Sequence, residues 1–234
     1  MPLDALLGYG LQLLGGAAIT VELAVSGYCL ALTLGAAVAL LRQLDSRIVT
    51  AVWRVYASIF MGVPSVLVMF LFFFGGSAMV GALGAMVGLA KGTVDVTPFQ
   101  AGLAALTIVQ GAYSAEVFAG AIRNVPRGQF EAARALAIRP HHVWWHVITP
   151  QVVRLALPGL VNVWISVLKD TALVSLAGLN EIVARSKTAA GASKEPFLFF
   201  VLAALFFVLI SSLTLHLSGR LEHRLGRGLR RATG

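Results

Sequence analysis

The chain is poor in charge and nearly free of cysteine. Only 12 % of its 234 residues are charged, whereas 58 % are hydrophobic and the mean hydropathy is +0.85. A soluble globular domain carries about 25 % charged residues, so the composition excludes that class. Cys29 is the one cysteine; it can form no internal disulfide, and we expect it to be a small buried packing residue.

Several functional motifs are also missing. The sequence contains no Gly-x-x-x-x-Gly-Lys-Ser/Thr phosphate loop, so we expect no nucleotide to be bound by this chain. Nothing in it resembles a nucleophile–base pair. His142 and His146 share a helix face, but no third metal ligand lies near them, and a polar interfacial face is the better interpretation. We therefore expect neither a catalytic nor a metal site.

Targeting and repeat signals are absent as well. The first residues, MPLDALLGYG, lack the basic n-region of a cleavable signal peptide. No internal repeat and no inverted pair of broken helices is recognisable, which argues against a self-contained secondary transporter. The chain is expected to form one domain over residues 1–234.

Long apolar runs are what the sequence does contain. A helix of about 20 apolar residues crosses a hydrocarbon core of ~30 Å, so the fold class is an all-α polytopic membrane protein. A short interfacial helix over residues 3–16 is expected to lead into the first span. We predict five spans, at about residues 17–41, 52–74, 99–122, 153–176 and 197–217.

The basic residues predict the orientation of the spans. Five spans place the two termini on opposite sides of the membrane. With the C-terminus inside, thirteen of the eighteen lysines and arginines lie in inner segments. Because cytoplasmic segments carry the excess of lysine and arginine, the N-terminus is predicted to be periplasmic and the loop 123–152 cytoplasmic. This placement also explains the net charge of +8 without nucleic acid as a partner.

The loop contains a polar stretch, Glu131–Pro150, that indicates two helical pieces bounded by prolines. The first is expected to end at Arg139, because a residue before proline disfavours the α conformation. Pro140 can open the second piece, which we expect to stop before Pro150. An exposed short helix that shows apolar side chains is typical of a segment that fits into another protein's groove.

Polar groups and a helix break interrupt the spans. Charged residues inside spans usually face the bundle interior, and Glu116 and the pair Lys169–Asp170 are such residues. They indicate either a pathway for a charged solute or a structural role, for Glu116 as the partner of an interior cation and for Lys169 as a snorkelling amine. The break at Gly62–Ser65 is either a cavity wall or an ordinary proline kink.

These residues resemble a known family, the integral-membrane permease subunits of ABC importers for polar amino acids. The resemblance is closest to the histidine/lysine/arginine/ornithine and octopine/nopaline types, and it covers nearly the whole chain. Its most specific part is the EAA motif, Glu131-Ala132-Ala133 with Ala137 at the usual glycine position. The other matching motifs are Gly62–Pro64, Gly111–Glu116, Val125–Gly128, Ala156–Gly159 and Lys169–Ser175.

The resemblance implies a type I ABC importer permease fold, with five transmembrane helices plus cytoplasmic coupling helices. Two such subunits, identical or homologous, would build the pathway in the lipid of the inner membrane. Each would dock into a cleft of an ATP-binding cassette ATPase, and a periplasmic binding protein would deliver the amino acid. ATP and Mg²⁺ would be bound by the ATPase, so this chain would bind no cofactor and would not be an enzyme.

The resemblance also assigns residues. The coupling surface would comprise Glu131, Ala132, Ala133, Leu136 and Ala137. The substrate pathway would comprise Glu116, Tyr113, Gly62, Pro64, Lys169, Asp170, Thr171 and Ser175.

Three positions depart from the family pattern. Ala137 replaces a glycine, whereas Met61 and Ala119 stand where relatives commonly have arginine. An intramembrane acid without those arginines favours a cationic solute. The predicted function is the permease subunit of an ATP-driven importer for a polar, basic amino acid. The alternatives are a stand-alone carrier or channel that works without ATP, and a membrane scaffold or sensor that does not transport.

Overall fold

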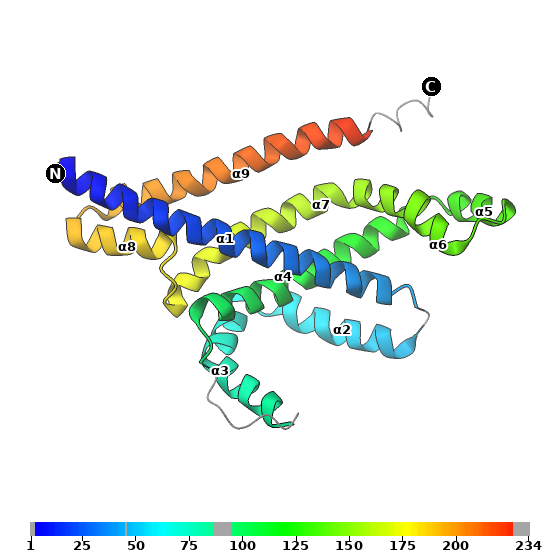
Figure 1. The fold of residues 1–234 in the computed structure, drawn as a ribbon, viewed down its shortest axis with the longest axis horizontal. Helices are drawn as coiled ribbons and strands as arrows, with labels where there is room; N and C mark the ends of the chain where they lie inside the picture. Colours follow the sequence, from blue (N-terminus) through cyan, green and yellow to red (C-terminus); the bar gives the residue numbers. More distant parts are fainter. Residues whose placement is uncertain (1–2, 45, 87–94, 227–234) are drawn as a thin grey trace.

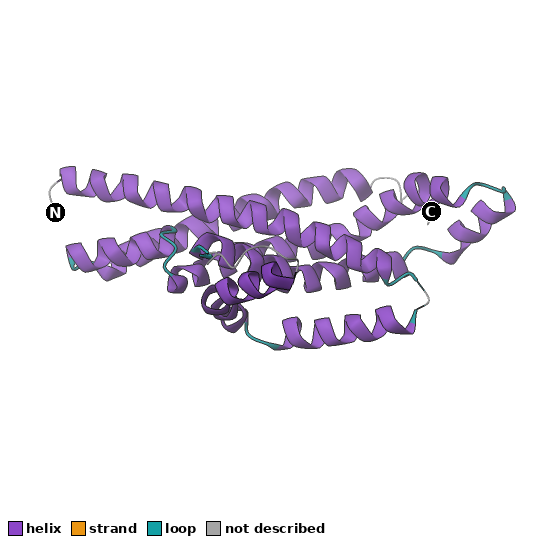
Figure 2. Ribbon diagram, turned by 60° about the horizontal axis from the view of Figure 1, so that its bottom comes forward, coloured by secondary structure: helices purple, strands orange, loops and turns teal. Residues whose placement is uncertain are grey.

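The structure, a computed structural model, describes residues 3–44, 46–86 and 95–226. Within these residues every regular element is a helix and no strand occurs (Figure 2). In chain order the elements are α1 (Leu3–Leu41), α2 (Arg47–Gly62), α3 (Ser65–Met86), α4 (Pro98–Arg123), α5 (Arg127–Ala135), α6 (Pro140–Val143), the π-helical turn η1 (Trp144–Ile148), α7 (Thr149–Asp170), the 3₁₀ turn η2 (Thr171–Ala177), α8 (Ile182–Ser193) and α9 (Pro196–Gly226).

The helices form an elongated bundle built around α1, α4 and α7 (Figure 1). The N-terminus and α8 lie at one end of this bundle, and α5 and α6 lie at the other. Helix α3 branches away from the bundle axis. Five helical segments among the described residues are long and apolar enough to cross a membrane, Gly8–Leu41, Ser65–Ala82, Pro98–Arg123, Pro140–Ala177 and Pro196–Leu221. The prediction of an all-helical fold with five spans is confirmed.

The expectation of a separate interfacial helix at residues 3–16 is wrong, because α1 is one continuous helix of 39 residues. The Gly15–Gly16 pair does not break it. A Cβ added at Gly16 would lie 2.9 Å from the Ile182 Cα atom, so this glycine permits close contact between α1 and α8. Cys29 on the same helix is exposed, against the prediction that it is buried.

The predicted second span, 52–74, is two helices. The break at Gly62–Ser65 is confirmed, since α2 ends at Gly62 and α3 begins at Ser65. The limits of both pieces differ from the prediction. Helix α2 begins at Arg47 and has no buried residue, whereas α3 continues to Met86 through glycines that the apolar pattern had suggested as its end. The segment apolar enough to span is therefore Ser65–Ala82.

Small residues bring α1 and α4 into direct contact. A Cβ added at Gly35 would lie 2.8 Å from the Ala115 backbone nitrogen, and one at Gly111 would lie 2.8 Å from the Leu34 side chain. Without a hydrophobic driving force in lipid, such close backbone approach supplies much of the packing between membrane helices. The α1–α4 pair is thereby a firm base for the polar groups that α4 carries.

Candidate functional site: a polar cavity and a helical loop

The loop at the α5–α6 end of the molecule turns at Ala137. Its φ of +52° is in the left-handed region, and two hydrogen bonds close the turn, from the Ile138 N–H to the Ala133 carbonyl (3.1 Å) and from the Ala137 N–H to the Arg134 carbonyl (3.0 Å). This pattern is a Schellman motif, in which a glycine is favoured at the left-handed residue. Helix α5 therefore ends at Ala135, earlier than the expected end at Arg139.

The second helical piece was predicted to stop before Pro150, but it runs into the spanning helix α7. Helix α6, the turn η1 and α7 are consecutive, and Pro150 lies in the first turn of α7. Proline lacks the N–H that an α-helical hydrogen bond would use at this position. The π turn accommodates it by changing the backbone hydrogen bonds just before it, since the Thr149 N–H bonds to the Trp144 carbonyl, five residues back. The loop is thus continuous with the spanning helix α7.

Most of the predicted coupling residues form an exposed surface on this loop. Glu131, Ala132, Leu136 and Ala137 are exposed, and Leu136 is 73 % exposed. Ala133 is different, because it is 5 % exposed and belongs to the buried cluster that joins α5 to α4 and α7. Four of the five predicted residues could therefore meet a partner, while Ala133 holds the loop onto the bundle.

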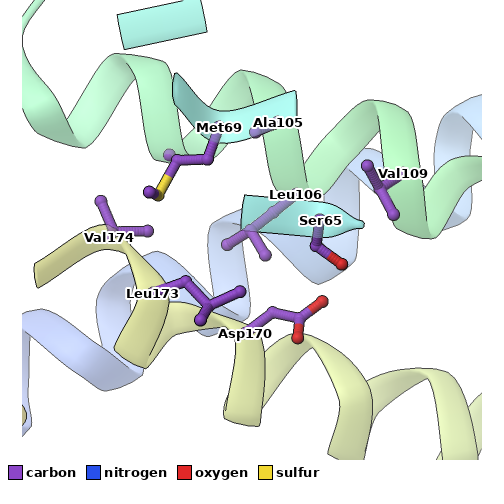
Figure 3. Close-up of a pocket in the computed structure, with 9 residues that line it drawn as sticks. Ser65, Met69, Ala105, Leu106, Val109, Asp170, Leu173 and Val174 are labelled. Atoms are coloured by element: carbon purple, nitrogen blue, oxygen red, sulfur yellow. The ribbon is translucent and has the colours of Figure 1, made fainter. Parts of the chain in front are cut away.

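A polar cavity lies among α3, α4 and α7, inside the segments that can span a membrane. Its volume is about 290 Å³, and its lining residues are Ser65, Gln110, Tyr113, Val163, Ser166, Lys169 and Asp170. Figure 3 shows a smaller, mainly apolar pocket that shares Ser65 and Asp170 with this cavity, with the Ser65 hydroxyl and the Asp170 carboxylate near each other and Met69, Leu106 and Val174 beside them. Three of the residues that line the polar cavity were predicted pathway residues, namely Tyr113, Lys169 and Asp170.

Gln110 and Asp170 form the centre of the cavity. The Gln110 Nε2 atom donates a hydrogen bond of 2.9 Å to Asp170 Oδ2. A carboxylate only accepts hydrogen bonds, so the amide must present its NH₂ group to Asp170 and leave its carbonyl oxygen free. That oxygen is buried and has no hydrogen-bond partner within the described residues. The cavity therefore offers the Asp170 carboxylate, held by Gln110, which suits a cationic or hydrogen-bond-donating solute.

The face of α7 beside the cavity is polar and exposed. Asn162, Ser166 and Lys169 follow one another at helical spacing, and all three are exposed. Polar residues in a span are costly next to lipid, so they normally face protein or a water-filled path. Tyr113 of α4 is 38 % exposed and its hydroxyl lies 3.5 Å from the Met61 carbonyl, beside the α2–α3 break.

The remaining predicted pathway residues lie elsewhere. Gly62 and Pro64 form the break itself, which places Ser65 at the cavity wall. The hydroxyls of Thr171 and Ser175 donate to carbonyls of their own turn, at Leu168 and Ala172. Neither lines the cavity. Ser65 was named only as part of the predicted break, for which a cavity wall was one alternative. The pattern of the spans missed Gln110, Ser166 and Asn162, although a lone glutamine in an apolar run, three residues before Tyr113, was an available signal.

Glu116 lies outside the cavity, in an ion-pair network toward the C-terminal end of α4. Its carboxylate accepts from Arg42 (2.8 Å) and from Arg123 (3.0 Å), and the Arg42 guanidinium stacks 4.2 Å from the centre of the Trp53 ring. The network links α1, α2 and α4. This geometry favours the structural alternative for Glu116, and its pathway role stays a prediction.

Comparison with known proteins places this arrangement in a family. Residues 13–227 match the family described as "Binding-protein-dependent transport system inner membrane component". The chain belongs to this family. It is a multi-pass component of the inner membrane, and the family implies partnership with a binding protein, an ATPase and a second permease.

Individual relatives of this inner membrane component agree in length and fold. The octopine transport system permease protein OccQ of Rhizobium radiobacter is 33 % identical over 96 % of this chain and 94 % of its own. The histidine/lysine/arginine/ornithine transport system permease protein HisQ of Escherichia coli K12 is 33 % identical over 97 % and 99 %. The crystal structure of an amino acid ABC transporter with histidines matches with a TM-score of 0.80, over 96 % of this chain and 99 % of that chain at 24 % identity, which shows the shared fold.

Two positions at which this family member lacks an expected arginine have different surroundings. Ala119 is buried in the cluster under α5, so a guanidinium there would require repacking of α4. Met61 is half-buried at the end of α2, and its carbonyl meets the Tyr113 hydroxyl. Neither position lines the polar cavity, so their substitution leaves the Gln110–Asp170 pair intact.

A buried acid, Glu181, lies at the opposite end of the molecule from the α5–α6 loop (Figure 1). It is fully buried, caps α8 by accepting from the Ala184 N–H (2.8 Å), and receives the Thr20 hydroxyl of α1 at 3.3 Å. Burial raises the pKa of the Glu181 carboxyl. Its contacts connect α8 to α1, and we assign it a structural role.

Proposed function

We propose that this chain is the permease subunit of an ATP-driven importer that carries a basic amino acid through a path lined by α3, α4 and α7. The observation that carries the proposal is the Gln110–Asp170 cavity within the spanning segments of a binding-protein-dependent transport component. Relatives named for octopine transport and for histidine, lysine, arginine and ornithine transport support the substrate class.

The chemistry of the cavity suits such a substrate. The Asp170 carboxylate, oriented by Gln110, would accept hydrogen bonds from a cationic side chain or an α-ammonium group. Lys169, exposed next to Asp170, would attract the α-carboxylate. Because the α7 face with Asn162 and Ser166 is also exposed, a second permease subunit would supply the opposite wall of the path.

The proposed orientation places the N-terminus in the periplasm and the exposed surface of Glu131, Ala132, Leu136 and Ala137 in the cytoplasm. There it would contact the ATPase subunit. Hydrolysis would take place on that partner, which also would hold ATP and Mg²⁺, while the continuous helix through α6, η1 and α7 would transmit movement to the cavity.

Reconstituted transport tests this function directly. The permease is placed in proteoliposomes with its ATPase subunit and binding protein, and uptake of labelled arginine, lysine, histidine and ornithine is compared with that of glutamate. We expect uptake of a basic amino acid only when ATP is present. Uptake that persists without the ATPase subunit would identify a stand-alone carrier and refute the proposal.

An Asp170→Asn variant tests the substrate site. We expect at least a tenfold loss of uptake at low substrate concentration, because removal of one partner of a desolvated charge pair costs ~2–5 kcal/mol. Glu22→Gln is the matched control, since Glu22 is an exposed acid of α1 that does not line the cavity. Equal uptake by both variants would show that Asp170 is not part of the substrate site.

A further inference from the structure

The coupling loop contains a cavity of its own. It has a volume of about 190 Å³ and lies between α5 and the start of α6. Its walls are apolar, formed by Phe130, Ala133, Ile138, Val143 and Trp144, and Arg134 is the one charged residue among the described residues that line it. A water molecule occupies ~30 Å³ in the liquid, so this cavity has room for a large side chain.

The walls of this cavity are held in place before any partner binds. Ala133 and Val143 are buried members of the cluster beneath α5, and the rings of Phe130 and Trp144 meet edge to face with their centroids 6.4 Å apart. The hydrogen-bonded turn at Ala137 fixes the angle between α5 and α6. A preformed apolar pocket with one convergent polar group has the features of a binding site.

Lipid is a poor occupant for this cavity. Helix α5 carries Arg127, Glu131 and Arg134, is absent from the segments that can span a membrane, and projects at the end of the bundle (Figure 1). Leu136 and Ile138 next to the cavity are exposed as well. The α6 wall of the cavity begins the segment Pro140–Ala177 that can span a membrane, whereas the α5 wall is charged and exposed. An apolar pocket beside a charged, exposed helix calls for a protein partner.

The charge of the loop indicates the chemistry of that partner. Arg127, Arg134 and Arg139 are exposed and Glu131 is the acid among them, so the surface is net basic. Both ion pairs within the described residues are made by Glu116, which leaves the Arg134 guanidinium available to a partner. A complementary surface would therefore carry a carboxylate beside its apolar contact.

We propose that the α5–α6 cavity is a socket that receives one large apolar side chain of the ATPase subunit, with an adjacent carboxylate of that subunit paired to Arg134. This inference rests on the proposed function. It makes the docking contact reciprocal, because the permease loop enters a cleft of the ATPase and the ATPase in turn fills a pocket in the loop. Central, desolvated pockets of this kind hold the residues that dominate binding energy.

Site-specific photo-crosslinking tests the socket. A benzophenone amino acid replaces Ile138, which lines the cavity, or Gln129, an exposed α5 residue that does not line it. The full permease is purified with its ATPase subunit and irradiated. We expect covalent capture of the ATPase from position 138 at least about tenfold above that from position 129, with the captured peptide containing an apolar residue flanked by an acid.

The outcomes separate the socket from the function on which it rests. If the ATPase copurifies but position 138 captures it no better than position 129, the socket is refuted and the proposed function stands. If no ATPase copurifies with the unmodified permease, the proposed function itself fails, and the socket fails with it.

Charge reversal tests the proposed pair independently. Arg134→Glu is compared with Arg127→Glu, a variant on the same helix whose side chain does not line the cavity. We expect Arg134→Glu to reduce copurified ATPase about tenfold or more and Arg127→Glu to reduce it less than threefold, since a charge at the rim of an interface contributes less than a desolvated one. Equal losses would refute the specific pairing of Arg134.

Discussion

At the scale of single residues, Ala137 explains why this position in the EAA motif favours glycine. Its φ of +52° closes the turn after α5, and a side chain in the left-handed region meets steric resistance that glycine avoids. Two backbone hydrogen bonds hold the alanine there. The shape of the docking loop is therefore retained with alanine, at a cost in stability.

An Ala137→Gly variant should recover that cost. We expect unfolding to become less favourable by about 1 kcal/mol, because glycine adopts positive φ without steric penalty. Thermal unfolding in detergent measures the change. Ala135→Gly is the control, since Ala135 is helical and its replacement should destabilise by roughly 0.5–1 kcal/mol. A destabilising effect of Ala137→Gly would contradict this account of the turn.

Glu116 illustrates how burial decides the value of an ion pair. It contacts two arginines at similar distances, yet the Arg42 side chain is 17 % exposed and the Arg123 side chain is 60 % exposed. Solvent screens the second pair and leaves the first largely intact. Arg42 also stacks on Trp53, which holds its guanidinium in position.

Double-mutant cycles should separate the two pairs. We expect a coupling energy of about 1–2 kcal/mol between Arg42→Met and Glu116→Gln, and less than about 0.5 kcal/mol between Arg123→Met and Glu116→Gln. Each cycle compares the unfolding free energies, measured in detergent, of the unchanged protein, the two single variants and the double variant. Coupling of the same size in both cycles would mean that exposure does not control this network.

At the scale of elements, α7 joins the coupling loop to the cavity. Its exposed polar face, Asn162, Ser166 and Lys169, lies inside a segment that can span the membrane. The exposed face of α9, by contrast, is apolar and includes Leu209. The two faces should therefore meet different surroundings, water for α7 and lipid for α9.

Cysteine accessibility tests this difference. In a Cys29→Ala background, we expect Asn162→Cys and Ser166→Cys to react with a charged thiol reagent at least ten times faster than Leu209→Cys, because the reactive thiolate forms in water and not in lipid. Labelling rates in membrane vesicles give the comparison. Slow labelling at all three positions would place the α7 face against lipid or a tight interface.

The sequence predicted the number of spans because long apolar runs dominate their formation, and α4 extends one residue beyond its expected limits at each end. The second span was misplaced, since 52–74 was predicted and Ser65–Ala82 is the segment apolar enough to span. The break at Gly62–Ser65 was also predictable from its proline. Other local signals gave wrong predictions of where helices end. Pro150 suggested a helix end, but the π turn before it accommodates the missing proline N–H and carries the helix onward.

The cavity was predictable only in part. Lys169 and Asp170 were recognisable because charge is rare in a span. Ser65 and Gln110 come from two other helices, and their proximity to Asp170 depends on how α3 and α4 pack, which no local pattern encodes. The same holds for Glu116, whose partner Arg42 is separated from it by 74 residues.

At the scale of the whole molecule, the distribution of charge along the bundle predicts its orientation in the membrane. The end with α5 and α6 carries Arg127, Arg134 and Arg139, together with Arg42 and Arg123 of the neighbouring helix ends. The excess of basic residues at this end favours the cytoplasm. The exposed loop and its cavity would then face the ATPase subunit.

Reporter fusions test the orientation. We expect a fluorescent protein at the C-terminus to fluoresce and alkaline phosphatase at the same place to be inactive, because the former matures in the cytoplasm and the latter in the periplasm. A phosphatase fusion after Lys194, between α8 and α9, should be active. The reverse pattern would show that the molecule has the opposite orientation, with the α5–α6 loop in the periplasm.

The π turn at Trp144–Ile148 has a geometric consequence for the two faces that it separates. Each residue added to an α-helix rotates the remainder of the helix by about 100°, since one turn takes 3.6 residues. The wider turn therefore sets the angular phase between the α6 wall of the α5–α6 cavity and the polar face of α7. Deletion of a single residue there would turn Asn162 and Lys169 out of register with the loop while leaving every side chain in both faces unchanged.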